Sequence, residues 1–474
     1  MQVPFSTRSI RFAYQHWFVA VLLGVFCTLS IQYTIKSMAN RSAINRWRDQ
    51  LQHLFDDNIY QRYAYPNPPI MAILLEPIAR LPALGGSLLW FYLKAGLAVL
   101  SIYWVFRLVE SQNHPFPPWA KCLTILLSIR PIFGDLTHGN VNLFILFLVV
   151  AALFAFKRKH DFTSGVLLAL AIACKVTPAL FVPYFLRKRA WKTLAGCALG
   201  MALFVFLIPG WYLGNERNLT LLHSWIDQMV TPYVVKGTVT TEHQNQSLPG
   251  LLYRLATHSP SFLDEKCDPE RYDNVCDLDP GIVKWIAKGA MIVFGILVLV
   301  SCRTPITERG AVPLRFLPPP RWGRVREGVI CHSPEPPTLS LPHDGGRECN
   351  GTTVRGQSWR LAAEFSIIVL GMLLFSERTW KHHCVTLLLP FAVISYFLAT
   401  MNSSRGMRFY LWGSLALAFL LMSSTSTTLI QSLDAKMAEV YGAYVWAYIV
   451  LLAALVVLLL RGKEWRAGLR YRPE

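Results

Sequence analysis

Residues 130–142 read Arg130-Pro-Ile-Phe-Gly-Asp135-Leu-Thr-His138-Gly-Asn140-Val-Asn142, and an apolar run of helical length follows them. A second apolar run is interrupted by Lys175-Val-Thr-Pro178 and then by Pro183. Charged and hydrogen-bonding side chains are costly near a bilayer, so a cluster of them between apolar runs indicates function. An apolar helix that is interrupted by Lys, Thr and Pro predicts backbone that lines a cavity inside the protein instead of facing lipid.

The composition places the chain among multi-pass membrane proteins. Of its 474 residues, 53% are hydrophobic and 16% are charged, whereas about 25% of the residues of a soluble protein are charged. Apolar runs long enough to span a bilayer recur from end to end. The predicted fold class is an all-α polytopic membrane protein with about ten transmembrane helices plus re-entrant or partial helices.

The positive charge of the chain predicts its orientation in the membrane. A net charge of +18 would indicate a nucleic-acid partner in a soluble protein. Here the Lys and Arg residues lie in short loops between apolar segments, as the positive-inside rule expects, so we predict no nucleic-acid partner. Arg8 and Arg11 precede the first apolar run. We therefore expect a protein of the cell (inner) membrane with both termini in the cytoplasm.

The sequence divides the chain into three predicted parts. Residues 1–302 form an N-terminal transmembrane part that holds the catalytic residues, with extracytoplasmic loops at 36–69 and 212–280. Residues 303–358 are rich in Pro and Arg and lack hydrophobic periodicity, which predicts a disordered cytoplasmic insert. Residues 359–474 form a C-terminal transmembrane part. No Cys-x-x-Cys pair occurs, so neither a zinc site nor a redox motif is predicted.

The segment between Gly165 and Leu186 admits two topologies. It lies between two basic clusters, at 157–159 and 187–189, and a simple span would place one of them outside. Two half-helices that enter and leave on the cytoplasmic side, divided at residues 175–178, would keep every basic loop inside. We prefer this re-entrant arrangement.

Three groups of candidate site residues converge on the outer face under this topology. The first is the acidic and aromatic loop at 36–69; the second comprises Asp135, His138, Asn140 and Asn142; the third comprises Arg378, Lys381, His382 and His383. Lys175 and Glu242 are further candidates for substrate binding. Cationic and imidazole groups suit a phosphate, and a carboxylate beside them can act as a general base.

Each of these residues also has a structural interpretation. Polar residues in a turn can satisfy its backbone, and Arg or Lys at a membrane boundary can extend toward the headgroups. For Lys175 the structural alternative is an ion pair that seals neighbouring helices. The shared location of the residues on one face favours function.

Three blocks of the sequence resemble glycosyltransferase family 87. The first is Tyr65-Pro-Asn-Pro-Pro69 with Leu74-Leu-Glu-Pro77. The second runs from His138-Gly-Asn-Val-Asn-Leu143 to Ile172-Ala-Cys-Lys-Val-Thr-Pro-Ala-Leu180 and Pro183-Tyr184. The third is Ser376 to Pro390, where Trp380-Lys-His-His-Cys-Val-Thr-Leu-Leu-Leu-Pro390 looks like that family's Trp-x-His-His block. Their order and spacing hold across most of the chain outside 303–358, and the second block is the most specific.

The resemblance implies a membrane enzyme of the GT-C type that transfers a hexose, typically mannose, from a polyprenyl-phosphate sugar to a lipid or glycan acceptor with inversion. An acidic residue of the first extracytoplasmic loop would deprotonate the acceptor hydroxyl, and the His382-His383 pair would hold the donor phosphate. The resemblance likewise implies no metal and no cofactor. The family's acid usually lies shortly after the first helix, where this chain reads Ser42-Ala-Ile-Asn45. The candidate bases are therefore Asp49, Asp57 and Asp135, with Glu242 as a further carboxylate.

Two other classes of function remain open at this point. A transporter or lipid flippase can also contain broken helices and buried charges, but it predicts inverted internal repeats, and we detect none. A catalytically degenerate member of the family, or a membrane scaffold without activity, is the remaining alternative.

Overall fold

The computed structural model describes residues 7–56, 58–63, 65–111, 114–235, 237–262, 271–306, 309, 358–427 and 430–461. Throughout these ranges the regular structure is helical, and the only β-type pairing is an isolated bridge between Pro260 and Tyr272. This confirms the predicted all-α class. Residues 310–357, which make up most of the predicted insert, lie outside the described ranges, and so does Asp57.

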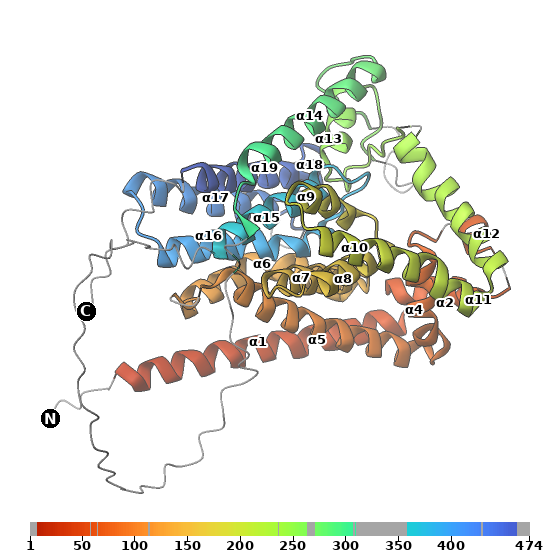
Figure 1. Cartoon of the computed structure of the whole chain (residues 1–474), viewed down its shortest axis with the longest axis horizontal. Helices are drawn as coiled ribbons and strands as arrows, with labels where there is room; N and C mark the ends of the chain where they lie inside the picture. The colour runs from red at the N-terminus through yellow and green to blue at the C-terminus, as the bar shows by residue number, and fades with distance from the viewer. Residues whose placement is uncertain are drawn as a thin grey trace, which may run out of the picture.

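Seven helical segments in the described ranges are long and apolar enough to cross a membrane. They are part of α1 (Thr7–Met38), α5 (Ala83–Val109), the continuous α10 (Trp191–Met201), η2 (Ala202–Leu207) and α11 (Ile208–Leu213), α14 (Pro280–Ser301), η5 (Lys381–Leu387) with α16 (Leu388–Thr400), α17 (Arg405–Ser423) and α19 (Ala443–Arg461). The chain is therefore a multi-pass membrane protein. Helices α6 (Pro118–His138), α7 (Asn142–Lys157) and α15 (Ser358–Leu374) pack among them (Figure 1).

The bundle has an interior layer and a lipid-facing layer. Every residue of α15 is buried, and so are 83% of the residues in the most apolar window of the η5–α16 segment. Only 17% of the corresponding window of α14 is buried, and its Trp285 and Ile292 are exposed. Apolar side chains that lie exposed on the outside of such a bundle are suited to contact with lipid. Helices α15 and α16 therefore form the core around which the other helices pack.

The second apolar run is broken where the sequence predicts. Helix α8 (Asp161–Cys174) ends at Lys175, whose backbone is extended, and the chain continues as η1 (Thr177–Leu180) and α9 (Phe181–Arg187). At the start of α8, Asp161 forms an ion pair with Arg309. After α9, the Lys188 ammonium donates a hydrogen bond to the carbonyl oxygen of Thr304 at 2.8 Å. Both ends of the broken helix thus lie beside Thr304 and Arg309, which matches the re-entrant arrangement and not a simple span.

Glycines bring α10 very close to α8. A Cβ on Gly196 would overlap the carbonyl oxygen of Phe162, and one on Gly165 would overlap that of Thr193. Contacts between small residues allow two helix backbones to approach closely within a membrane. Helix α10 thereby supports the half-helix that ends at Lys175.

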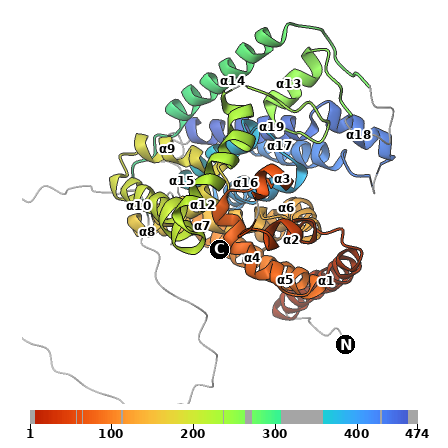
Figure 2. The ribbon, with the colours of Figure 1, turned by 90° about the vertical axis from the view of Figure 1, so that its right-hand side faces the viewer.

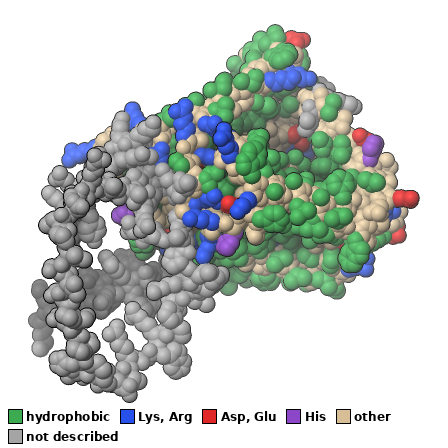
Figure 3. Space-filling model, viewed as in Figure 1, with side chains coloured by type: hydrophobic (Ala, Val, Ile, Leu, Met, Phe, Trp, Pro, Cys, Tyr) green, Lys and Arg blue, Asp and Glu red, His purple; other side chains and the backbone are tan. Residues whose placement is uncertain are grey.

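The short helices gather at the end of the bundle that faces the viewer in Figure 2. They are α2 (Ala43–Gln52), α3 (Ile59–Tyr63), α4 (Pro69–Arg80), α12 (Asn215–Trp225), η3 (Ile226–Val235), α13 (Leu248–Ala256) and α18 (Ser432–Val440). At the opposite end, the end of α9 lies beside the end of α14, where Arg187 donates a hydrogen bond to the carbonyl oxygen of Leu299. Arg187, Arg189 and Lys192 are exposed there. Figure 3 shows Lys and Arg side chains gathered toward that side of the surface and hydrophobic side chains over its middle. The two ends of the bundle therefore differ in charge.

Replacing Gly196 by alanine should destabilise the protein by about 1–3 kcal/mol, because the added methyl group forces α10 away from α8. The measurement is the apparent melting temperature of the purified chain in detergent. Gly289→Ala on α14 is the matched control, because no atom lies within 4 Å of a Cβ at that position. If both variants melt at the wild-type temperature, the close approach of the two helices does not contribute to stability.

Candidate active site

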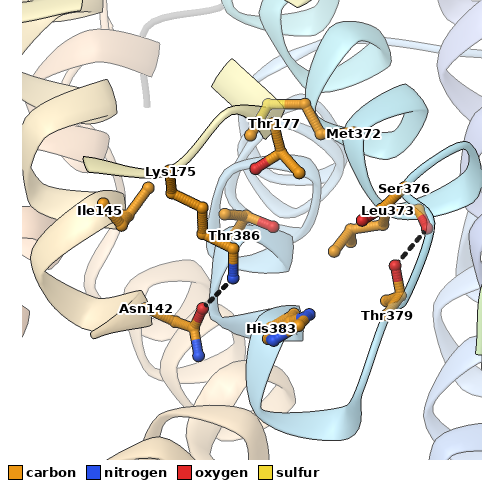
Figure 4. A pocket seen from close by; sticks show the side chains of 10 residues that line it. All are labelled: Asn142, Ile145, Lys175, Thr177, Met372, Leu373, Ser376, Thr379, His383 and Thr386. Carbon is orange, nitrogen blue, oxygen red and sulfur yellow. Dashed lines mark hydrogen bonds between the residues drawn. The ribbon is translucent and has the colours of Figure 1, made fainter. Parts of the chain in front are cut away.

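A pocket opens where the start of α7, the break after α8, the end of α15 and the helix η5 meet (Figure 4). Its polar lining consists of Asn142, Lys175, Thr177, Ser376, Thr379, His383 and Thr386, and its apolar lining of Ile145, Met372 and Leu373. Two of the three sequence blocks that contain candidate residues, at 138–184 and 376–390, therefore contribute to one cavity.

Lys175 is the cation of this pocket. Its ammonium donates a hydrogen bond to Oδ1 of Asn142 at 2.6 Å, as Figure 4 shows. No salt bridge joins Lys175 to a carboxylate within the part of the chain that the structure describes. The sealing ion pair considered as an alternative is therefore not formed, and the pocket has a positive charge directed into it.

Asp135 lies beneath the pocket and has no exposed surface. Its Oδ1 accepts a hydrogen bond from the Asn142 amide at 3.0 Å, and its Oδ2 accepts one from the backbone N–H of Leu143 at 3.2 Å. The Lys94 ammonium lies 3.2 Å from the same Oδ2. Asp135 is a candidate base, and its carboxylate is buried and bound by three partners, an arrangement that favours a structural role.

Sequence reasoning missed Lys94. Its side chain is completely buried, and its ammonium also donates to the backbone carbonyl of Asp135 at 2.7 Å. The signal was present, because Lys94 is a single charged residue in the middle of the apolar run 87–106. Such residues within a membrane span are functional candidates by default.

The turn between α6 and α7 depends on Gly139. It has a φ of +81°, and a Cβ there would approach both the backbone nitrogen of Ala43 and the hydroxyl of Tyr33 to 3.2 Å. The indole N–H of Trp90 donates to its carbonyl at 3.0 Å. Glycine therefore lets the turn pack directly beneath α2.

The two adjacent histidines face different surroundings. The ring of His382 stacks on His138 with 4.6 Å between the centroids, and its Nε2 lies 3.0 Å from the Asn140 amide nitrogen. Arg46 on α2 contacts His138 at 3.2 Å. The ring of His383 is nearly perpendicular to that of His382, at 88°, and lines the pocket. The pair thus connects the pocket to a cationic outer rim.

Asp49 lies on this rim side of the molecule. Its side chain is 70% exposed and lies 3.7 Å from His53. Asp49 and Arg46 are three residues apart on α2, so they share one face of the helix. Arg46 is the residue that contacts His138, and Asp49 is therefore a solvent-accessible carboxylate within one helical turn of the cluster.

The remaining predicted residues do not line the pocket. Lys381 forms an ion pair with Glu439 and donates to the carbonyl of Thr425 at 2.9 Å, so its ammonium is bound within the protein. Arg378 lies 3.4 Å from the hydroxyl of Thr240 and stacks over Trp380. Glu242 is half-buried, and its backbone carbonyl accepts from Arg254 at 2.8 Å. A role for Lys381 in substrate binding stays a prediction.

A buried polar network holds these residues. Arg254 of α13 donates to the backbone carbonyls of Glu242 and Val440, each at 2.8 Å, and burial lowers its pKa to about 10. His243 lies 3.6 Å from Glu439, and burial lowers the pKa of its imidazole to about 4. Burial raises the pKa of Glu439, against the opposing effect of Lys381. The network fixes the loop at 240–247 against α18 and the start of η5.

The burial of His243 in this network predicts that the folded protein is less stable at acidic pH. Between pH 6.5 and about pH 4, the unfolded chain protonates His243 and the folded chain does not. Stability contributed by this residue is therefore complete above pH 6.5 and falls as the pH falls through that window. After screening by solvent the expected loss is about 2 kcal/mol.

The test is the melting temperature of wild type and His243→Gln, measured from pH 7 to pH 4.5. The wild-type value should fall more steeply, because glutamine does not titrate. Parallel curves for the two proteins would contradict the assignment of this sensitivity to His243.

No group of three or more His, Cys, Asp or Glu side chains within the described ranges is arranged to hold a metal ion. The cations of the site are instead lysine and arginine side chains, with Lys175 inside the pocket and Arg46 at its rim.

Comparisons with known proteins give consistent matches. The sequence model of glycosyltransferase family 87 matches residues 65–316, more than half of the chain. A polyprenol-phosphate-mannose-dependent alpha-(1-2)-phosphatidylinositol mannoside mannosyltransferase of Mycolicibacterium smegmatis is 29% identical over 213 residues, covering 41% of this chain and 46% of the relative. The protein of the same name from Mycobacterium tuberculosis is 28% identical over 216 residues, covering 43% and 48%.

A phosphatidylinositol pentamannoside mannosyltransferase of Mycolicibacterium smegmatis, also polyprenol-phosphate-mannose-dependent, is 29% identical over 280 residues. The match covers 55% of this chain and 63% of that relative. The chain thus spans about half the length of the first two curated relatives. No solved structure gives a significant match.

Proposed function

Because the chain belongs to glycosyltransferase family 87, we propose that it is a GT-C type enzyme that transfers a hexose from a polyprenyl-phosphate sugar to a lipid or glycan acceptor. Mannose is the first candidate for the sugar, since its relatives are named as polyprenol-phosphate-mannose-dependent enzymes. Those names also support an acceptor that is a glycolipid.

The observation that carries this proposal is the ammonium of Lys175 in the pocket beside His383. A cation without a carboxylate partner in a partly buried cavity favours an anionic ligand. Two unit charges 4 Å apart attract each other by about 4 kcal/mol at the effective dielectric constant of a protein surface. The phosphate of the donor is the anion that the family's reaction would bring to this position.

The reaction would proceed by direct displacement. A carboxylate of the first loop, Asp49 or Asp57, accepts the proton of the acceptor hydroxyl, and the hydroxyl oxygen attacks the anomeric carbon. The bond from that carbon to the phosphate oxygen breaks, and the oxygen keeps the electron pair. Lys175 and His383 stabilise the departing phosphate, while Arg46, His138, Asn140 and His382 line the rim from which the acceptor approaches.

The same proposal includes the orientation of the protein. Arg187, Arg189 and Lys192 are exposed, and Arg187 contacts the end of α14 that lies away from the short helices, which supports a cytoplasmic location for that end and for both termini. The site then opens on the extracytoplasmic face of the cell (inner) membrane. A transporter or lipid flippase is not favoured, because the comparisons match glycosyltransferases.

The first test uses the purified chain in detergent with radiolabelled polyprenyl-phosphate mannose and a membrane lipid extract as the acceptor pool. Wild type should form a labelled glycolipid. The His382→Ala/His383→Ala variant should lose most of the activity, because it lacks the imidazoles at the pocket and its rim. If the wild type binds the donor without forming product, the sugar or acceptor is wrong; if it binds no donor, the proposed function fails.

A second test identifies the base. Asp49→Asn should lower the transfer rate by about 10²–10⁴-fold with little change in donor affinity, if Asp49 is the general base. The matched control is Asp227→Asn, since Asp227 is also an exposed helical carboxylate paired with a histidine four residues away. Unchanged transfer by Asp49→Asn together with loss in Asp57→Asn would assign the base to Asp57 instead.

A further inference from the structure

Lys94 lies outside the pocket wall but is connected to it. It belongs to α5, and none of the residues that line the pocket comes from that helix. Its ammonium contacts both the backbone oxygen and the carboxylate of Asp135, at 2.7 and 3.2 Å. A lysine charge is costly to bury in a membrane protein, so the complete burial of Lys94 indicates that the residue has a function.

A chain of hydrogen bonds leads from this ion pair to the pocket. The amide nitrogen of Asn142 donates to Asp135 at 3.0 Å, and the amide oxygen of Asn142 accepts from Lys175 at 2.6 Å. An asparagine amide has a donor end and an acceptor end. Since Asp135 takes the donor end, the acceptor end is directed at Lys175, whose ammonium Figure 4 shows beside Asn142 and near His383.

The charges along this chain do not cancel. It contains two lysines and one aspartate, and the aspartate is paired directly with Lys94 and not with Lys175. Asp135 nevertheless acts electrostatically on Lys175 through the short distance that Asn142 bridges. If Lys94 were neutral, the charge of Asp135 would be free to compensate Lys175, and the pocket would lose its net attraction for an anion.

We propose that Lys94 is a positioning residue for the pocket: by neutralising Asp135 it leaves the charge of Lys175 available to an anionic ligand. Asp135 and Asn142 transmit this effect and fix the direction of the Lys175 ammonium. The inference rests on the proposed function in taking the ligand to be the phosphate of a polyprenyl-phosphate donor.

The experiment measures equilibrium binding of a ³²P-labelled short-chain polyprenyl phosphate without a sugar to the purified full chain in detergent. Lys94→Met should weaken binding by about tenfold, which corresponds to about 1.4 kcal/mol. Lys94→Met/Asp135→Asn removes both charges of the pair and should bind within about threefold of wild type, a difference below 1 kcal/mol. Lys94→Arg keeps the charge and should resemble wild type.

Lys157→Met is the matched control. Lys157 is also a buried lysine, but it donates to the backbone carbonyls of Arg107, Leu108 and Glu110 at the end of α5. It should lower the melting temperature and leave probe binding unchanged. A purely structural role for Lys94 would give the same pattern as Lys157→Met, so the two roles are separated by the binding measurement.

Three results would overturn the inference: wild-type affinity in folded Lys94→Met, no recovery of binding in the double variant, or no probe binding by wild type. The double variant leaves neither charge of the pair buried without its partner, so it tests the inference even if Lys94→Met does not fold. Probe binding with the expected pattern, but no binding of the polyprenyl-phosphate sugar donor, would support this inference and overturn the proposed function.

Discussion

The buried carboxylate of Asp135 is the interaction on which the rest of the site depends. It joins Lys94 of α5, its own helix α6 and the first residues of α7 in one set of contacts. An ionised carboxylate in a membrane interior requires such a complete set of partners, since removing one of them would leave an uncompensated charge. The turn at Gly139, the direction of Asn142 and the position of Lys175 all follow from satisfying this one group.

The broken helix supplies the other half of the arrangement. Thr177-Pro178 prevents α8 from continuing, and the chain turns back so that both of its ends lie beside Thr304 and Arg309. The break at residues 175–178 is surrounded by α7, α15 and η5. Its irregular backbone therefore lines the pocket and does not contact lipid. Gly165 of α8 and Gly196 of α10 let the continuous helix α10–η2–α11 pack closely against α8, which ends at this break.

Much of this could be predicted from the sequence, because membrane spans and their breaks are encoded locally. Apolar runs predicted the bundle, and Lys175 and Pro178 predicted the break. The partners of individual charges are different, because they depend on which helices become neighbours. Asp135 and Lys94 are 41 residues apart, and Lys381 and Glu439 lie on different helices, so the sequence alone did not show that Asp135 and Lys381 are bound within the protein. Lys175 lines the cavity as predicted, because the helix break that contains it is determined by neighbouring residues in the sequence.

The depth of the site has a consequence for the shape of the acceptor. The indole of Trp90 donates a hydrogen bond to the turn at Gly139. Trp90 lies seven residues after the start of α5 at Ala83. The N-terminal part of α5 therefore extends about 10 Å past the turn. Helix α2 packs over the same turn. In the proposed reaction, the acceptor hydroxyl would have to reach past α2 and the start of α5. A slender chain end, such as the terminal sugar of a linear glycan, would suit the proposed acceptor better than a hydroxyl on the surface of a folded globular protein.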